Sequence, residues 1–202
     1  ANVSHEVRTP LALIQMHAEL LKMGRAGTAK KQRQYYDTIY RESVRLGRLI
    51  DNILDFSRME SGIKESGLQP VNLAEVIRDT LATYRIQLQE DGFRLLEDWD
   101  HPTPVIDAHP GLLQQALTNL LDNSVKFSPK VKEIGLRLYH SGEEVVLEVS
   151  DKGIGVAADE QNRIFEKFYR SEDRRVQTTR GTGLGLPLVK HIMEIHHGRI
   201  QV

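Results

Sequence analysis

Apolar residues near the beginning of the chain recur at alternating spacings of three and four, and this spacing constrains the fold more than any other feature of the sequence. It gives a helix one narrow apolar seam along its length. A glycine-containing segment, residues 24–28, interrupts the pattern, so the sequence predicts two antiparallel helices with a short connection. The seam residues are Val7, Leu11, Ile14, Ala18 and Leu21 in the first helix and Tyr36, Ile39, Ser43, Leu46, Ile50, Ile53 and Ser57 in the second.

A hairpin of this kind is too small to bury both seams well by itself. The usual solution is a second copy of the hairpin, which completes a four-helix bundle and makes the protein an obligate homodimer. We therefore predict that residues 1–66 form a helical hairpin within a dimeric four-helix bundle, and that dimerisation depends on residues 1–60.

The composition changes after a polar, glycine-bearing linker at residues 61–70. Residues 67–202 combine helical periodicity with strand-like alternation, which predicts helices packed on one face of a mixed sheet, an α/β sandwich, and an α+β protein overall. We expect residues 156–180 to be mostly irregular and a strand to begin at Arg199. The expected helices span residues 73–90, 110–126 and 183–197, and the expected strands span residues 94–99, 104–107, 134–138 and 145–149.

The overall composition excludes several classes of protein and site. The net charge is −1 without any acidic or basic block, which argues against nucleic acid or a lipid surface as a bulk partner. The absence of cysteine excludes disulfides, thiolate zinc sites and cysteine nucleophiles. The longest apolar runs are far shorter than the roughly 20 residues of a membrane span, and no signal peptide is visible. Because the chain begins at Ala1 inside a helical pattern, we expect a longer protein, with any membrane attachment in segments outside this chain.

The stretch SHEVRTPL, residues 4–11, places a histidine and a proline inside the first predicted helix. An interior proline costs roughly 3 kcal/mol, because a backbone hydrogen bond is lost and the ring clashes with the preceding turn. His5 lies about 200° around the helix from the seam residue Val7, so we expect it to face water. A single exposed histidine is usually only a solvated side chain, but here the adjacent Glu6 could accept its proton and make it a nucleophile.

Two asparagines, Asn119 and Asn123, are four residues apart and share one face of the helix predicted at residues 110–126. They could be solvated or capping residues. Alternatively, their amide oxygens are suited to a hard cation such as Mg²⁺, which binds chiefly through phosphates, and Lys126 could supply a phosphate-binding charge.

Two glycine-rich motifs follow. DKGIG, residues 151–155, comes directly after a predicted strand, and its carboxylate could accept a hydrogen bond from the amino group of a base, although a plain turn would also explain it. GTGLGL, residues 181–186, opens a predicted helix, where backbone N–H groups are available to a phosphate. A Rossmann site is not indicated, because a polar loop rather than a strand precedes this motif.

Three histidines near the end of the chain, His191, His196 and His197, do not have spacings that bring three ligands to one helix face. Instead of a metal site, we predict cations that the helix dipole favours at the C-terminal end of the last helix. The aromatic cluster FEKFY, residues 165–169, is predicted to anchor the long loop by packing.

In this order and combination, the motifs resemble those of the transmitter portion of two-component sensor histidine kinases. SHEVRTPL resembles the H box, and NLLDNSVKF, residues 119–127, resembles the N box. DKGIG resembles the first glycine box, FEKFY the F box and GTGLGL the second glycine box. The resemblance covers nearly the whole chain, and the motifs are highly specific in combination.

The resemblance implies a dimerisation and histidine-phosphotransfer hairpin at residues 1–66 and a Bergerat-type ATP-binding domain at residues 67–202, with ATP and Mg²⁺ as ligands. His5 would accept the γ-phosphoryl group of ATP and Glu6 would be the base. The group would then pass to an aspartate on the receiver domain of a response regulator, and Thr9 would position water for dephosphorylating that regulator. We expect a cytoplasmic location, which includes the case in which this chain is the cytosolic part of a membrane sensor.

The same resemblance implies roles for residues of the ATP site. Asn123, assisted by Asn119, would hold Mg²⁺. Lys126 and Arg170 would touch the phosphates, and Asp151 would bind the adenine amino group. Gly153 and Gly155 would shape the floor under adenine, and Gly181, Gly183 and Gly185 would hinge a lid over the phosphates. Phe127, Thr182 and Leu184 complete the predicted nucleotide-binding residues.

The chain departs from the family pattern at a few positions. Val7 and Phe127 replace the commoner leucine and tyrosine, and His197 stands where a glycine is usual, which affects the geometry of one turn. The family fold continues beyond the strand expected at Arg199 with a glycine turn and a further strand, which are missing from this chain.

Two other functions remain open from the sequence. ATPases of the Hsp90, gyrase and MutL type share the ATP fold, but they hydrolyse ATP with a glutamate at the position of Asn119, and an asparagine cannot act as that base. The second alternative is a non-catalytic dimeric scaffold that binds ATP only to change shape.

Overall fold

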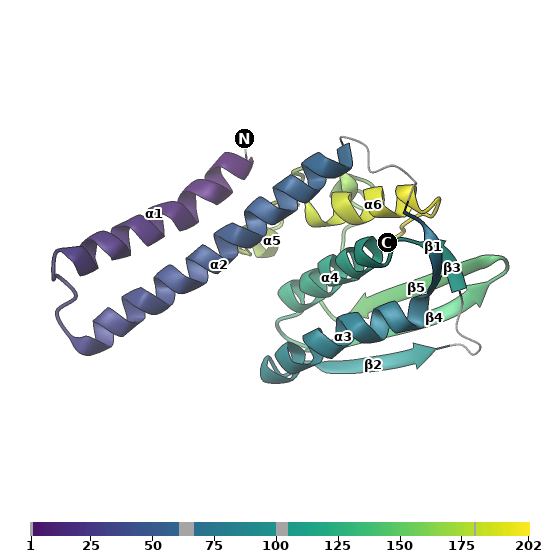
Figure 1. Cartoon of the computed structure of the whole chain (residues 1–202), viewed down its shortest axis with the longest axis horizontal. Coiled ribbons are helices and arrows are strands. Elements are labelled where there is room, and N and C mark those ends of the chain that lie inside the picture. Colours follow the sequence, from purple (N-terminus) through teal and green to yellow (C-terminus); the bar gives the residue numbers. More distant parts are fainter. Residues whose placement is uncertain (1, 61–66, 100–104, 180) are drawn as a thin grey trace. The chain divides into compact units, whose positions relative to one another are not determined.

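The computed structural model describes residues 2–60, 67–99, 105–179 and 181–202. The chain divides into two structural units, Ala1–Gly62 and Ile63–Val202, which we describe separately (Figure 1). The first unit is a helical hairpin and the second combines helices with two small sheets, so the predicted α+β class is confirmed. The elements are α1 (Asn2–Lys22), α2 (Ala29–Glu60), β1 (Gln69–Asn72), α3 (Leu73–Glu90), β2 (Arg94–Trp99), β3 (Val105–Ala108), α4 (Pro110–Phe127), β4 (Glu133–Ser141), β5 (Glu144–Asp151), η1 (Arg163–Phe165), α5 (Arg174–Thr178) and α6 (Gly185–Ile195).

Helices α1 and α2 pack side by side as the predicted antiparallel hairpin (Figure 1). The turn between them contains Gly24 and Gly27, whose φ angles of +67° and +68° are rarely adopted by residues with a Cβ. The rings of His17 and Tyr35 are in contact, with centroids 4.9 Å apart. This contact shows which positions of the two helices lie at the same level.

Helix α2 carries two apolar stripes, and the single predicted seam mixed residues of both. The stripe toward α1 is half-buried to buried and consists of Ile39, Leu46, Leu49 and Ile53. The second stripe lies on the neighbouring face of the helix and is between 44% and 72% exposed. We call it the outer stripe, and it consists of Tyr36, Tyr40, Ile50 and Leu54.

The second unit is built on a mixed sheet, as predicted. Strand β2 pairs with β4 in parallel, and β4 pairs with β5 in antiparallel orientation. Helices α3 and α4 cover one face of this sheet, and α6 packs against α4 (Figure 1). The core between the layers is completely buried, with no exposed surface on Ile77, Leu81, Leu121, Ile134 and Leu136.

Local signals located the long helices of this unit accurately. Helix α3 has its predicted span, and the side chain of Asn72 caps it by accepting a hydrogen bond from the N–H of Ala74 at 3.1 Å. Helix α4 begins at Pro110, a position that tolerates proline because the first N–H groups of a helix have no acceptor within the helix. The helix ends at Phe127, one residue beyond the predicted end.

Two segments differ from the prediction. Strand β1 lies partly in the expected linker, and it pairs with β3 in a separate two-stranded sheet. Residues 156–179 are mostly irregular, as predicted, and include the short helices η1 and α5. The strand expected at Arg199 is wrong, because residues 199–202 pair with no backbone among the residues that the structure describes, whereas a strand needs such a partner. The guanidinium of Arg199 instead forms an ion pair with Glu144 at 2.7 Å.

Helix α6 ends in a Schellman arrangement. The N–H of His197 donates to the carbonyl of Glu194 at 3.1 Å, and the N–H of Gly198 donates to the carbonyl of Met193 at 2.8 Å. His197 has a φ of +52°, in the left-handed region where this motif normally has glycine. The turn is therefore kept although the usual glycine is replaced.

His196 joins the end of α6 to the beginning of α4. Its Nδ1 lies 2.7 Å from the carbonyl oxygen of Ile192, and its Nε2 accepts a hydrogen bond from the backbone N–H of His109 at 3.0 Å. These contacts fix the orientation of the ring at the end of α6.

Candidate functional site

The SHEVRTPL stretch lies in helix α1, which continues through Pro10. The side chains of His5 and Glu6 lie outside the described residues, so the expected orientation of His5 stays a prediction. Thr9 is exposed, and Pro10 is buried. Since proline has no N–H, the carbonyl of Glu6 lacks its helical donor, while the proline ring itself packs inside the hairpin.

A carboxylate that sequence reasoning missed lies close to the level of Pro10. His17 and Tyr35 are in contact, and the two helices are antiparallel. Pro10, seven residues before His17, therefore lies close to the level of Glu42, seven residues after Tyr35. Glu42 is only 8% exposed and accepts a hydrogen bond from Arg45 at 3.2 Å. It occupies the inner face of α2, where the 3.6-residue period alone predicts an apolar residue.

The two asparagines of α4 face the beginning of α6. The Nδ2 of Asn119 donates to the carbonyl of Gln115 at 2.9 Å, which directs its Oδ1 away from the helix backbone. A Cβ on Gly185 would lie 3.2 Å from this Oδ1 and 3.8 Å from the Nδ2 of Asn123. The structure therefore brings the NLLDNSVKF and GTGLGL motifs together, as the predicted site requires.

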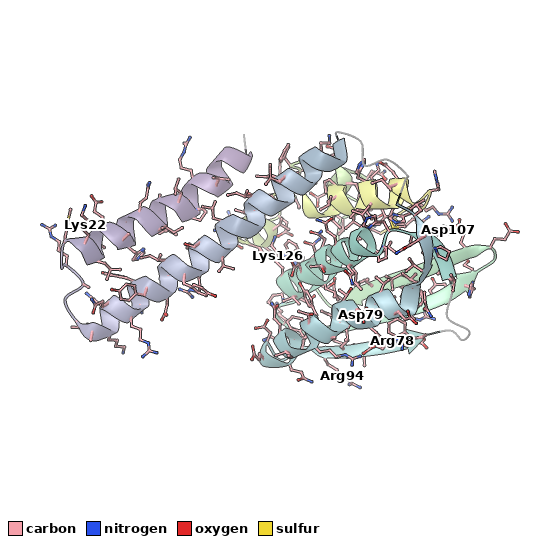
Figure 2. All side chains as sticks on the ribbon, in the orientation of Figure 1. Lys22, Arg78, Asp79, Arg94, Asp107 and Lys126 are labelled. Atoms are coloured by element: carbon pink, nitrogen blue, oxygen red, sulfur yellow. The ribbon has the colours of Figure 1, made fainter. Side chains whose placement is uncertain are left out.

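Lys126 connects the same two motifs. Figure 2 shows it at the C-terminal end of α4, and its Nζ lies directly against Gly181, in the place that a Cβ would occupy. The same Nζ lies 4.8 Å from the ring centroid of Phe127. A side chain at position 181 would move the end of this flexible lysine aside, so glycine allows the amine to lie against the glycine-rich loop.

Asp151 is held in a fixed orientation at the end of β5. Its Oδ1 accepts hydrogen bonds from the N–H of Gly153 at 2.8 Å and from the hydroxyl of Ser128 at 3.1 Å. Within the described part of the chain, no hydrogen bond reaches the other oxygen, Oδ2. A Cβ on Gly153 would lie 2.6 Å from both Asp151 Oδ1 and the carbonyl oxygen of Phe127, so only glycine fits. Sequence reasoning missed Ser128, which is fully buried.

The aromatic cluster and the second glycine motif are in backbone contact. The N–H of Phe168 donates to the carbonyl of Gly183 at 3.0 Å. A Cβ on Gly183, which has a φ of +70°, would lie 2.6 Å from the carbonyl oxygen of Tyr169. Phe168 itself has a φ of +64°, which is an outlier for a bulky residue. The predicted packing role of the cluster thus has a specific partner, the GTGLGL loop.

Arg170 contacts α5 in this structure. Its guanidinium donates to the carbonyls of Val176 at 2.7 Å and of Thr179. Helix α5 is capped at its other end by Asp173, which accepts from the N–H of Arg175 at 2.7 Å. Hydrogen bonds from the Arg175 side chain and backbone lower the pKa of Asp173 to about 2.

The remaining predicted residues differ in exposure. Leu184 is 2% exposed and Thr182 is 8% exposed, and the hydroxyl of Thr182 accepts from the N–H of Leu184 at 3.3 Å. Their side chains therefore stabilise the start of α6. Gly155 is exposed and has a φ of +69°, so it forms the turn at the end of the DKGIG motif.

The described residues contain no group of three or more His, Asp or Glu side chains that could hold a metal ion. In the same part of the chain, none of the helices is long and apolar enough to cross a membrane. The polar groups on the α4 face are instead amide oxygens, an amine and backbone N–H groups. Such groups suit a phosphate with its metal ion better than a metal ion alone.

Comparison with known proteins supports two consecutive domains. Residues 1–62 match the family described as "His Kinase A (phospho-acceptor) domain", and residues 108–202 match the family described as "Histidine kinase-, DNA gyrase B-, and HSP90-like ATPase". The solved mycobacterial sensor histidine kinase MprB is 30% identical, covers 66% of this chain and 83% of its own, and has a TM-score of 0.58. The chain belongs to the sensor histidine kinases.

Other relatives agree with this assignment. The circadian input-output histidine kinase CikA of Synechococcus elongatus is 35% identical across 100% of this chain, which corresponds to 27% of CikA. The histidine kinase ThkA, solved in complex with the response regulator TrrA, covers 98% of this chain and 55% of its own, with a TM-score of 0.73. At 20% identity, this last likeness shows the fold alone. The kinase chain described here spans 27% to 52% of the length of the first curated relatives that it matches.

Membership of this family makes the second unit an ATP-binding domain that follows a phosphoacceptor hairpin. The three motifs contributed by α4, β5 and the start of α6 lie within that unit. The family description of the ATP-binding domain includes ATPases, and it is the phosphoacceptor hairpin that distinguishes the histidine kinases from them.

Proposed function

We propose that this chain transfers the γ-phosphoryl group of ATP to His5 and then to an aspartate on the receiver domain of a response regulator. One observation carries the proposal. The same chain has a phosphoacceptor helix with SHEVRTPL and an ATP-binding unit in which Asn119 and Asn123 face the glycine-rich start of α6.

In the first step, an unprotonated ring nitrogen of His5 attacks the γ-phosphorus of ATP. The bond from this phosphorus to the bridging oxygen breaks and ADP leaves. Glu6, the next residue along α1, accepts the proton from the other ring nitrogen. In the second step, a carboxylate oxygen of the regulator attacks the phosphorus and the bond to the histidine nitrogen breaks.

In the ATP site, we propose that Oδ2 of Asp151 accepts a hydrogen bond from the adenine amino group, since Oδ1 is already bound by Gly153 and Ser128. Lys126 supplies positive charge to the phosphates beside Gly181, where its amine already lies. Arg170 joins it after leaving the carbonyls of α5. Backbone N–H groups of the GTGLGL loop and the N-terminal end of α6 favour the same negative charge.

The amide oxygens of Asn123 and Asn119 are the proposed protein ligands of Mg²⁺. The hydrogen bond from Asn119 Nδ2 to the carbonyl of Gln115 leaves its Oδ1 available for this role. Magnesium, when bound, neutralises charge on the phosphates of the nucleotide.

We further propose a homodimer in which the outer stripe packs against a second hairpin. The support is the continuous exposure of Tyr36, Tyr40, Ile50 and Leu54, which a single hairpin leaves in water. Thr9, which is exposed one turn beyond His5, is the proposed residue for regulator dephosphorylation. The proposed location is the cytoplasm, which supplies both ATP and regulators.

The test is incubation of the chain with ATP labelled in the γ-phosphate, followed by treatment of the protein with acid and with alkali. We expect label on the protein that is labile in acid and stable in alkali, and its complete loss in His5→Gln. Release of free phosphate without labelled protein would support the ATPase alternative. Binding of Mg·ATP without either product would support the scaffold.

A further inference from the structure

Glu160 lies outside the predicted site, in the turn that precedes η1. Its backbone carbonyl accepts hydrogen bonds from the N–H groups of Arg163 at 2.8 Å and of Ile164 at 3.0 Å, so its position on the main chain is well defined. Its carboxylate accepts a hydrogen bond from the Tyr169 hydroxyl at 2.7 Å. The carboxylate therefore binds the residue directly before Arg170.

Further contacts strengthen this cluster. The guanidinium of Arg163 lies over the ring of Tyr169, 4.4 Å from its centroid. The hydrogen bond from Tyr169 lowers the pKa of Glu160, and the same bond raises the pKa of Tyr169. Both shifts mean that the ionised carboxylate and the protonated phenol are the forms that fit together. Hydrogen bonds to an ionised acceptor are roughly twice as strong as neutral ones.

The segment held by Glu160 carries α5. Arg170 donates to the carbonyls of Val176 and Thr179, as described above. The side chain of Gln177 donates to the carbonyl of Ser171 at 2.6 Å, and Ser171 Oγ accepts from the N–H of Asp173 at 3.1 Å. Ser171 is 9% exposed, so these bonds are largely shielded from water. The position of α5 thus depends on residues 169–171.

The same segment also contacts the glycine-rich loop. The backbone of Phe168 and Tyr169 lies against Gly183, and Phe168 keeps a φ that a bulky residue adopts only when its surroundings enforce it. A displacement of Tyr169 would therefore reach the loop at residues 181–186 as well as Arg170.

We propose that Glu160 is a positioning residue for the nucleotide phosphates, which holds Tyr169 so that the adjacent Arg170 can exchange the carbonyls of Val176 and Thr179 for a phosphate. This inference rests on the proposed function, because it takes the phosphates to bind between the GTGLGL loop and α4. It adds a residue, Glu160, that acts through Arg170 and does not itself touch the nucleotide.

The experiment measures affinity for ATP and for adenosine in the whole chain carrying His5→Gln, which prevents turnover. Glu160→Gln removes the charge and Tyr169→Phe removes the donor, and each should weaken ATP binding about tenfold with less than about a twofold effect on adenosine. In combination with Arg170→Ala, neither should weaken ATP binding further. Glu144→Gln is the matched control, since it breaks the carboxylate–guanidinium pair with Arg199 at 2.7 Å outside this region.

A second measurement needs no nucleotide. Trypsin should cleave after Arg174 and Arg175 several times faster in Glu160→Gln and Tyr169→Phe than in the unsubstituted chain or in Glu144→Gln. The role of Glu160 would be overturned if trypsin cleavage were unchanged, or if adenosine affinity fell as much as ATP affinity. It would also be overturned if the loss of ATP affinity added to the loss caused by Arg170→Ala. Faster cleavage in a chain that binds no ATP would instead leave the anchoring role standing and contradict the proposed function.

Discussion

The two units of this kinase chain differ in how completely they bury their apolar side chains. In the ATP-binding unit, Ile77, Leu81 and Leu121 have no exposed surface. In the hairpin, Tyr40 is 72% exposed and Leu54 is 47% exposed, although both lie on a regular apolar stripe. The ATP-binding unit completes its core within one chain, whereas the hairpin leaves half of its apolar pattern for another surface.

This difference separates two parts of the proposed chemistry. Nucleotide binding depends on contacts within one unit, for example Asp151 with Ser128 and Lys126 with Gly181. The phosphoacceptor lies on a hairpin whose stability, on the proposed function, depends on a second copy. Substitutions in the two units should therefore have separable effects, and the following predictions test that separation.

The largest expected effect is on phosphoryl transfer. His5→Gln should abolish labelling from ATP and leave ATP affinity unchanged, because the substituted residue lies in the hairpin and the nucleotide site in the other unit. Asp151→Asn should weaken ATP binding about tenfold or more, since the amide replaces one acceptor oxygen with a donor. Labelling and equilibrium binding measure the two effects, and loss of both activities with either substitution would contradict the separation.

The next effect concerns the oligomeric state. Replacing Ile50 and Leu54 of the outer stripe with glutamate should raise the dimer dissociation constant by about 100-fold or more, because burial of each such side chain is worth about 1.5–3 kcal/mol. Sedimentation equilibrium measures this change. Ile86→Glu is the matched control, since Ile86 is 65% exposed on α3 and should not affect association. A dimer that survives both stripe substitutions would contradict the proposed interface.

Core substitution in the ATP-binding unit should show the opposite pattern. Leu121→Ala should lower the free energy of unfolding of this unit by about 2–5 kcal/mol, because it leaves a cavity at a position with no exposed surface. Thermal unfolding followed by circular dichroism would report the loss, and the dimer constant should stay the same. A change in association as large as the change in stability would show that the units are not independent.

The smallest effect concerns the end of α6. His197→Gly should stabilise the ATP-binding unit by about 0.5–1 kcal/mol, because glycine adopts the φ of +52° without strain. Denaturant unfolding can resolve this gain, and Gly198→Ala provides a contrast. Its new Cβ would lie 2.7 Å from the side chain of Met193, so it should give no gain. A destabilised His197→Gly variant would show that the histidine side chain contributes more than its backbone strain costs.

Much of the fold was predictable because its signals are local. The spans of α3 and α4 follow from helical periodicity together with Asn72 and Pro110 at their starts. Strand β1 was missed because it pairs with β3, far along the chain, and its residues include Pro70, which favours a linker interpretation. The strand expected at Arg199 was wrong for a related reason, since an alternating pattern makes a strand only where a neighbouring backbone pairs with it.

The candidate site divides in the same way. Motif order was sufficient to name Asn119, Asn123, Lys126 and Asp151, since each stands in a characteristic short stretch. Glu160 was missed because its partner is at position 169, nine residues further along the chain, and nothing in the local pattern relates the two. The two stripes of α2 could not be separated from the sequence either. The helical period of 3.6 residues places them on adjacent faces, and it does not indicate which face packs against α1.

The sequence by itself determined the family and the order of the two units, and it supplied the candidate residues for the proposed chemistry, because spacing and motif are properties of neighbouring positions. Only the tertiary structure decided which atoms meet: the asparagines with Gly185, the lysine with Gly181, and Glu160 with Tyr169. It also decided which half of the apolar pattern in the hairpin stays exposed. These outcomes depend on packing between segments distant along the chain, and local propensity carries no information about that packing.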